Sequence, residues 1–167
     1  MGIYHEKKFR KGKKNFQITV NYGSPLHEEW SKVLRMIVWR GNIELKGRTF
    51  NLASSTKDFT CYLATLKEES HLWKIEKDFQ NEEIIPADMM QFFAFCQQGG
   101  LEEINPDCPL PIVAAAPGST WRCSHETLHE MAGVYWDGFY HNPGPNLSTV
   151  SAPFEIGTRF LAIRPPA

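Results

Sequence analysis

The sequence predicts a single α+β domain, spanning residues 1–167, in which a mainly antiparallel sheet, a meander of strands, packs against two helices. Three observations support this prediction: segments that alternate apolar and polar residues, two segments with apolar residues at helical spacing, and a proline-rich C-terminal third. Of the 167 residues, 42% are hydrophobic and 22% are charged. This length and composition are typical of one folded domain and exclude a disordered chain.

The first strand and the first helix follow each other near the N-terminus. Residues 16–22 alternate apolar and polar side chains and are rich in strand-forming types, which predicts a strand. A helix is predicted over residues 25–39, because apolar residues recur three or four positions apart after Ser24 and Pro25, a typical helix start. Gly41 stands where a helix would end.

Two hairpins are expected in the middle of the chain. Residues 43–52 would form one, with a glycine in its two-residue turn. Residues 59–66 and 72–77 would form the other, since apolar and charged residues alternate in the second segment. The apolar spacing of residues 59–66 also fits a helix, but the abundance of aromatic residues and threonine favours strands.

The rest of the chain is expected to hold a second helix, a last strand and many loops. The helix would begin at Pro86, because large apolar residues occupy positions 89–96 before a glycine pair. The strand is predicted over residues 154–163. Nine of the eleven prolines lie after residue 104, and proline is disfavoured in central strands and helix interiors. Residues 104–167 are therefore predicted to be a loop-rich part of the same domain.

The formal net charge of −1 conceals a strong polarity along the chain. Residues 1–48 contain eleven basic and four acidic residues, whereas residues 49–103 contain four basic and ten acidic residues. We expect residues 1–14 to form a flexible basic tail or a charged sheet edge, whose bases could contact phosphates and whose Phe9 could stack on a nucleic-acid base. The candidate polyanion-binding residues are Lys7, Lys8, Phe9, Arg10, Lys11, Lys13 and Lys14.

Large aromatic residues gather in the C-terminal third beside polar loop residues. Such a cluster fits a surface that recognises a protein, because aromatic rings supply contact area at a small entropic cost. It fits a hydrophobic core equally well. The residues concerned are Trp121, Tyr135, Trp136, Phe139 and Tyr140.

A His-Glu-x-x-His motif, the form found in zinc metallopeptidases, begins at residue 125. On a helix His125 and His129 would share a face and bind one Zn²⁺, while Glu126 would activate a metal-bound water as general base. The extended form of the motif is absent, because Ala132 stands where that form has glycine. The candidates for a third ligand are His141, first, and Asp137 and Glu155.

The four cysteines form no Cys-x-x-Cys pair, which is typical of a reducing compartment. A pairing of Cys108 with Cys123 stays open. A second zinc hypothesis uses the same histidines structurally, because thiolates and imidazoles together make closed tetrahedral sites. The thiolates would come from Cys123 and from either Cys108 or Cys96.

The sequence therefore predicts a soluble, cytoplasmic, non-enzymatic domain that binds another macromolecule without a cofactor. We expect a protein partner, held by the aromatic C-terminal surface, the basic N-terminal surface or both. The first alternative is a small zinc-dependent hydrolase, and the second is a domain that binds nucleic acid or another polyanion. A membrane partner is not expected, because the longest apolar run, residues 112–116, is far too short to cross a bilayer. The oligomeric state is left open.

Overall fold

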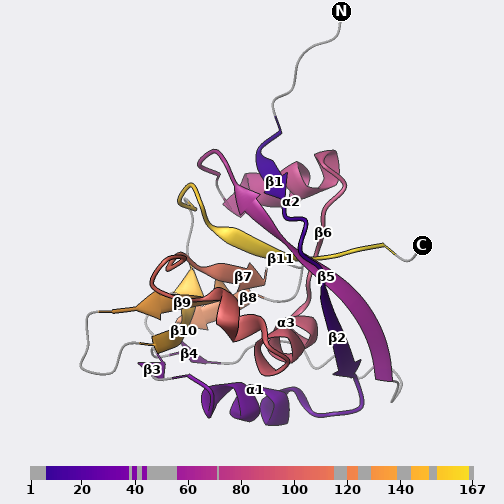
Figure 1. Cartoon of the computed structure of the whole chain (residues 1–167), viewed down its shortest axis with the longest axis vertical. Helices are drawn as coiled ribbons and strands as arrows, with labels where there is room; N and C mark the ends of the chain where they lie inside the picture. The colour runs from indigo at the N-terminus through magenta and orange to yellow at the C-terminus, as the bar shows by residue number, and fades with distance from the viewer. Residues whose placement is uncertain are drawn as a thin grey trace, which may run out of the picture.

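The computed structural model describes residues 7–37, 39–40, 43–44, 56–70, 72–114, 120–123, 129–138, 144–150 and 154–165. In these parts of the chain strands and helices form a mixed, mostly antiparallel open sheet with helices on both faces (Figure 1). The strands are β1 Phe9–Lys11, β2 Phe16–Asn21, β3 Trp39–Arg40, β4 Ile43–Glu44, β5 Thr56–Leu66, β6 Ile85–Pro86, β7 Ile112–Ala114, β8 Thr120–Cys123, β9 His129–Asp137, β10 Gly144–Val150 and β11 Arg159–Ile163. The helices are α1 Leu26–Leu34, α2 Leu72–Asn81, α3 Met89–Gln97 and the short 3-10 helix η1 Gly100–Glu103.

The sheet has a more complex strand order than the predicted meander. Its main path runs β1-β5-β11-β7-β9-β10-β3, so strands distant in sequence become neighbours. Most neighbours are antiparallel, whereas β11 with β7 and β10 with β3 are parallel. Parallel neighbours need crossover connections, which a meander lacks. The α+β class is confirmed, and the simple up-and-down order is wrong.

Both faces of the central strands are buried. Along β5, Cys61 belongs to the core beneath α1 and α3, while the next residue, Tyr62, belongs to the core beneath α2. Leu161 and Ala162 of β11 alternate in the same way. Successive side chains of a strand point to opposite faces, so each of these strands contributes to two cores. The sheet is thus covered on both faces.

Helix α2 is the main departure from the predicted elements, because residues 72–77 were expected to form a strand. Ile75 and Phe79 lie four residues apart, and both are fully buried in the core that α2 covers. Between them Glu76 and Lys77 are exposed. The pattern of residues 72–77 is compatible with the two-residue period of a strand and with the 3.6-residue period of a helix. The apolar residue at position 79, four after Ile75, favours the helix. The structure therefore has a third helix.

The two predicted helices are present as α1 and α3, but their bounds differ from the predicted ones. Helix α3 begins at Met89, because Asp88 caps it, and the predicted start, Pro86, lies in strand β6. Helix α1 ends at Leu34 rather than near residue 39. At the start of α3, the Asp88 carboxylate accepts a hydrogen bond from the Gln91 backbone N–H (2.7 Å), and the Gln91 side chain accepts one from the Asp88 N–H (2.8 Å). This reciprocal capping box satisfies two N–H groups that a helix start leaves free.

The expected strands are confirmed in part. Residues 59–66 belong to the longer strand β5, so the strand prediction prevails over the helical one. Of the hairpin predicted over residues 43–52, β4 pairs with β8, and residues 45–52 lie outside the described part of the chain. The last strand begins at Arg159, later than predicted, while Phe154 forms an isolated bridge with Ser70.

The C-terminal third contains more strand than its prolines suggested. In its described part, Pro111 precedes β7 and Pro165 follows β11, while Pro145 lies within β10, opposite Trp136. The guanidinium of Arg159 organises the segment before that strand by donating hydrogen bonds to the carbonyl oxygens of Glu103 (2.8 Å), Cys108 (3.1 Å) and Leu110 (3.0 Å). Burial lowers the pKa of the Arg159 guanidinium. Arginine nevertheless stays charged at physiological pH, so these hydrogen bonds hold the segment in place.

None of the helices in the described part of the chain has the length and apolarity that crossing a membrane requires. The helices instead pack on the sheet. Beneath α2, aromatic rings surround Phe160 of β11, whose ring centroid lies 5.3 Å from that of Phe79, 5.3 Å from that of Phe154 and 5.9 Å from that of Phe9. These edge-on contacts connect β1, α2 and β11 in one cluster.

We expect Phe160→Ala to lower the free energy of unfolding by about 3 to 5 kcal/mol, because it leaves a cavity at the centre of this cluster. Urea denaturation followed by circular dichroism measures the change. Ile156→Ala is the matched control, since Ile156 is 63% exposed. Equal effects of the two substitutions would contradict the central role of Phe160.

Candidate binding surface

The basic N-terminal segment is built into the fold from residue 7 onward. Strand β1 pairs antiparallel with β5, and Phe9 is 2% exposed. Its ring stacks on Phe79, with 5.1 Å between the centroids. The prediction that Phe9 stacks on a nucleic-acid base is therefore wrong for this structure, because the ring anchors β1 in the core. Residues 7–14 form a charged sheet edge rather than a loose tail.

Two of the six basic residues in this segment form internal ion pairs. The ammonium of Lys8 lies 3.2 Å from a carboxylate oxygen of Asp78, and that oxygen also accepts a hydrogen bond from the Ser70 hydroxyl (3.0 Å). Lys14 pairs with Glu103, whose hydrogen bond and charge raise the pKa of Lys14. Both acidic partners come from the acidic middle of the chain. The opposite charges of the two segments thus meet across the fold, but only in part.

The other four bases, Lys7, Arg10, Lys11 and Lys13, remain exposed. Within the described residues none of them forms an ion pair. Their positive charge is therefore not neutralised by described acidic groups of the protein itself. We call these four residues the basic edge.

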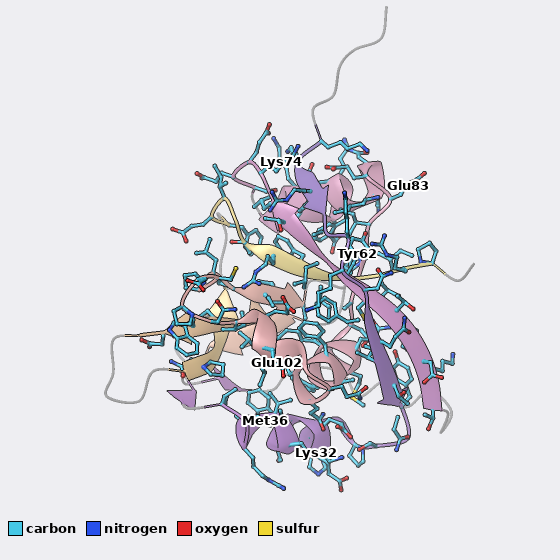
Figure 2. The ribbon with its side chains drawn as sticks, in the orientation of Figure 1. Lys32, Met36, Tyr62, Lys74, Glu83 and Glu102 are labelled. Atoms are coloured by element: carbon cyan, nitrogen blue, oxygen red, sulfur yellow. The ribbon has the colours of Figure 1, made fainter. Side chains whose placement is uncertain are left out.

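A loop between β1 and β2 carries part of the basic edge, and Arg164 holds this loop in place. The Arg164 guanidinium donates hydrogen bonds to the side-chain oxygen of Asn15 (2.9 Å) and to the backbone oxygen of Gly12 (2.9 Å). It also lies 4.1 Å from the ring centroid of Tyr62, a cation–π contact. Tyr62 lies near the middle of β5 in Figure 2. Sequence reasoning missed Arg164, because no local motif links position 164 to the N-terminal segment.

Gly12 is required where the loop leaves β1. Its N–H donates a hydrogen bond to the Leu63 carbonyl oxygen (2.8 Å), and a β-carbon on residue 12 would lie only 2.8 Å from that oxygen. Any other residue would push the loop away from β5. The close approach of Gly12 and the Arg164 contacts together fix the segment that presents Lys13.

The aromatic residues of the C-terminal third are described in part. Tyr135 and Trp136 are half-buried, and Trp136 packs against the core beneath α1 and α3. The backbone N–H of Trp136 donates to the Pro109 carbonyl oxygen (3.0 Å). Trp121 lies in β8, but its side chain is outside the description, as are Phe139 and Tyr140. Trp136 therefore contributes to the core, and the joint aromatic surface stays a prediction.

The His-Glu-x-x-His motif does not continue as a helix. His129 is the first residue of strand β9, which pairs with β7, β8 and β10. The predicted helix is thus wrong from residue 129 onward, because the extended run to Asp137 serves as a strand between neighbours on both edges. His125, Glu126 and His141 lie outside the described residues. In the part of the chain that is described, no three acidic, histidine or cysteine residues gather as metal ligands.

Asp137, one of the candidate third ligands, is buried and accepts a hydrogen bond from the side-chain amide of Asn146 (3.0 Å). No described residue donates a hydrogen bond to the buried side-chain oxygen of Asn146. The Asp137–Asn146 hydrogen bond thus links the side chains of β9 and β10. Glu155, another candidate, is exposed after the bridge at Phe154.

The described cysteines carry free thiols. Cys108 is exposed and unpaired, so this structure does not contain the disulfide with Cys123 that the sequence left open. Cys61 and Cys96 are buried, and burial raises the pKa of Cys96 and that of Cys61, the latter to about 12. The burial of Cys96 in the core removes it as a ligand of a surface zinc site.

Asp88 and Tyr22 form a half-buried ionisable pair next to Cys61. The Tyr22 hydroxyl donates to a carboxylate oxygen of Asp88 (2.9 Å), and the other carboxylate oxygen caps α3. Burial raises the pKa of Asp88, although hydrogen bonds from Gln91, Tyr22 and Met90 oppose that shift. Burial and the Asp88 charge also raise the pKa of Tyr22. Asp88 caps α3, and the Tyr22 ring packs edge-on against Phe59 (6.2 Å between centroids), so we assign the pair a structural role.

Comparison with known proteins adds no family to these observations, since no family model, curated protein or solved structure matches the chain.

We expect Asp88→Asn to flatten part of the pH dependence of stability. Because the pKa of Asp88 is raised in the folded state, the wild type loses stability as the pH rises from the ordinary aspartate pKa through the raised one. Asparagine caps a helix equally well and carries no charge. Urea denaturation at several pH values between about 3 and 7 measures the difference. Parallel pH profiles of the two proteins would refute the raised pKa.

We expect Arg164→Ala to loosen the loop at residues 12–15. The substitution removes the hydrogen bonds to Asn15 and Gly12 and the cation–π contact with Tyr62. Amide hydrogen exchange at residues 12–15 should therefore become about tenfold faster. Arg164→Lys should restore little, because lysine lacks the planar, forked donor geometry. Arg35→Ala, at an exposed position after α1, is the control. If amide exchange at residues 12–15 is unchanged in Arg164→Ala, Arg164 does not hold this loop in place.

Proposed function

We propose that the protein is a non-enzymatic domain that binds an acidic macromolecule through the basic edge, Lys7, Arg10, Lys11 and Lys13. One observation carries this proposal: four adjacent exposed bases lie on a fixed segment, and no described acidic group neutralises them. A cluster of like charges raises the local electrostatic potential and attracts an oppositely charged partner.

The fixed position of the basic edge supports binding rather than a merely solvating role. Phe9 anchors β1, and Arg164 and Gly12 hold the following loop, so the backbone that carries the bases is already ordered. A preordered surface loses less conformational entropy on association than a flexible tail does. The same anchoring removes the one ring of residues 7–14 from the surface. Charge is therefore the main means of recognition at this edge.

A protein with an acidic surface is the partner we favour, and nucleic acid is the alternative. Recognition of single strands usually relies on exposed aromatic rings, and Phe9 is buried. Tyr135, which is half-buried, and the aromatic residues outside the description would add contact area for a protein partner. The zinc-hydrolase alternative loses part of its geometric reason at His129, because this residue begins a strand. Residues four apart are about 6 Å apart along a helix but about 13 Å apart along a strand, which is too far for two imidazoles to bind one metal ion.

We expect replacement of Lys7, Arg10, Lys11 and Lys13 by glutamine to abolish most binding to acidic macromolecules. Fluorescence anisotropy with poly-L-glutamate, a short DNA duplex and a single-stranded RNA, each over a range of salt concentrations, measures it. For a DNA duplex the slope of log K against log salt should fall in magnitude by about 3 to 4 if all four bases contact phosphates. Binding to poly-L-glutamate but to neither nucleic acid would identify an acidic protein as the partner.

The control replaces four exposed bases outside the basic edge, Lys32, Arg35, Lys57 and Lys77, by glutamine. This variant has the same net charge as the first. A loss of binding seen only in the first variant is therefore due to the basic edge and not to the lower net charge. The control should bind nearly as the wild type does. If both variants weaken equally, or if the wild type binds none of the three probes, the proposal is wrong.

A further inference from the structure

The outer edge of strand β2 is occupied by a side chain. The Gln98 carboxamide accepts a hydrogen bond from the Thr19 backbone N–H (2.9 Å) and donates one to the Thr19 carbonyl oxygen (2.8 Å). A neighbouring strand would make these two hydrogen bonds in an antiparallel pair. Gln98 therefore takes the place of a strand at Thr19, although both residues are exposed.

The end of helix α3 holds Gln98 at this position. The Gln98 N–H donates to the Ala94 carbonyl oxygen (2.9 Å), and Gly99 follows with a φ of 105°, which turns the chain away from the helix. Helix α3 lies beside β2 in Figure 1, and Ile18, Val20 and α3 residues share one core. The backbone of residue 98 is thus fixed relative to β2.

Strand β1, next along the same edge, is protected in another way. The Glu82 carboxylate accepts hydrogen bonds from the backbone N–H groups of Lys8 (2.9 Å) and Phe9 (3.2 Å). Arg10 and Lys11 also place positive charge on this strand. Charged residues on an edge strand oppose pairing with a second copy, because like charges would meet.

Strand β2 has no such charge. Its six residues, Phe16–Asn21, include no charged residue and no proline. An antiparallel pair of two β2 strands centred on Thr19 would place Thr19 opposite Thr19 and Ile18 opposite Val20, so no like charges would meet. Uncharged strands rich in β-branched residues readily pair edge to edge.

We propose that Gln98 blocks self-association of the protein by occupying the edge of β2, and that its removal opens this edge to β2 of a second copy. The resulting dimer would have twofold symmetry, with the same strand contributed by each copy. Gln98 thus guards a self-complementary edge that the charges of β1 do not protect.

Analytical ultracentrifugation of Gln98→Ala tests the proposal. We expect the association constant for dimer formation to rise at least about tenfold over that of the wild type at equal salt. A second substitution, Thr19→Pro, should reverse the rise, because proline removes the outward N–H. It leaves the ladder with β5 intact, since both Thr19 backbone groups face Gln98. Circular dichroism verifies that each variant is folded.

Two single variants serve as controls. Gln97→Ala removes the neighbouring contact with Glu29 (2.7 Å) and leaves Gln98 in place. Glu82→Ala frees N–H groups of β1, whose charges remain. Both should associate as weakly as the wild type. A Gln98→Ala protein that associates no more than the wild type overturns the proposal. It is also overturned if the dimer survives Thr19→Pro, or if Glu82→Ala dimerises as strongly as Gln98→Ala.

Discussion

Strand β5 is hydrogen-bonded along both edges and largely buried on both faces from Cys61 to Leu66, and most other elements take their positions from it. Along its outer edge it pairs with β1 at one end and β2 at the other, while β11 occupies the inner edge. Two separate strands on one edge require the chain to leave and rejoin the sheet between them. The loop at residues 12–15 meets that requirement. The geometry of the sheet therefore places Lys13 on an exposed loop beside the other residues of the basic edge.

Several elements were predictable because one signal dominated locally. Strand β2 alternates apolar and polar residues, and α3 has a nearly continuous apolar run before a glycine pair. Helix α2 was not predictable from its first six residues, which fit either period. The two-sided burial of β5 was also missed, because Thr65 and other polar residues interrupt its apolar run and suggest a strand with one face in water.

The candidate binding surface was predictable in composition but not in geometry. The run of bases was evident, yet its division into paired and free charges depends on Asp78 and Glu103, which the fold brings from far along the chain. Arg164 is still more remote, and no local pattern predicts a contact that joins it to Gly12. The His-Glu-x-x-His motif shows the reverse error, since a local pattern suggested a helix where pairing with neighbouring strands produces β9.

The contact between Arg164 and the loop at residues 12–15 has a consequence for the order of folding. Strand β11 fills the inner edge of β5 and supplies Phe160 to the aromatic cluster, so both cores stay incomplete until residues 159–164 are present. During synthesis the apolar faces of the early strands therefore stay uncovered until residues 159–164 have left the ribosome. Such long-range closure slows folding. Because Arg164 holds the loop at residues 12–15, we expect this loop to be one of the last features of the fold to form.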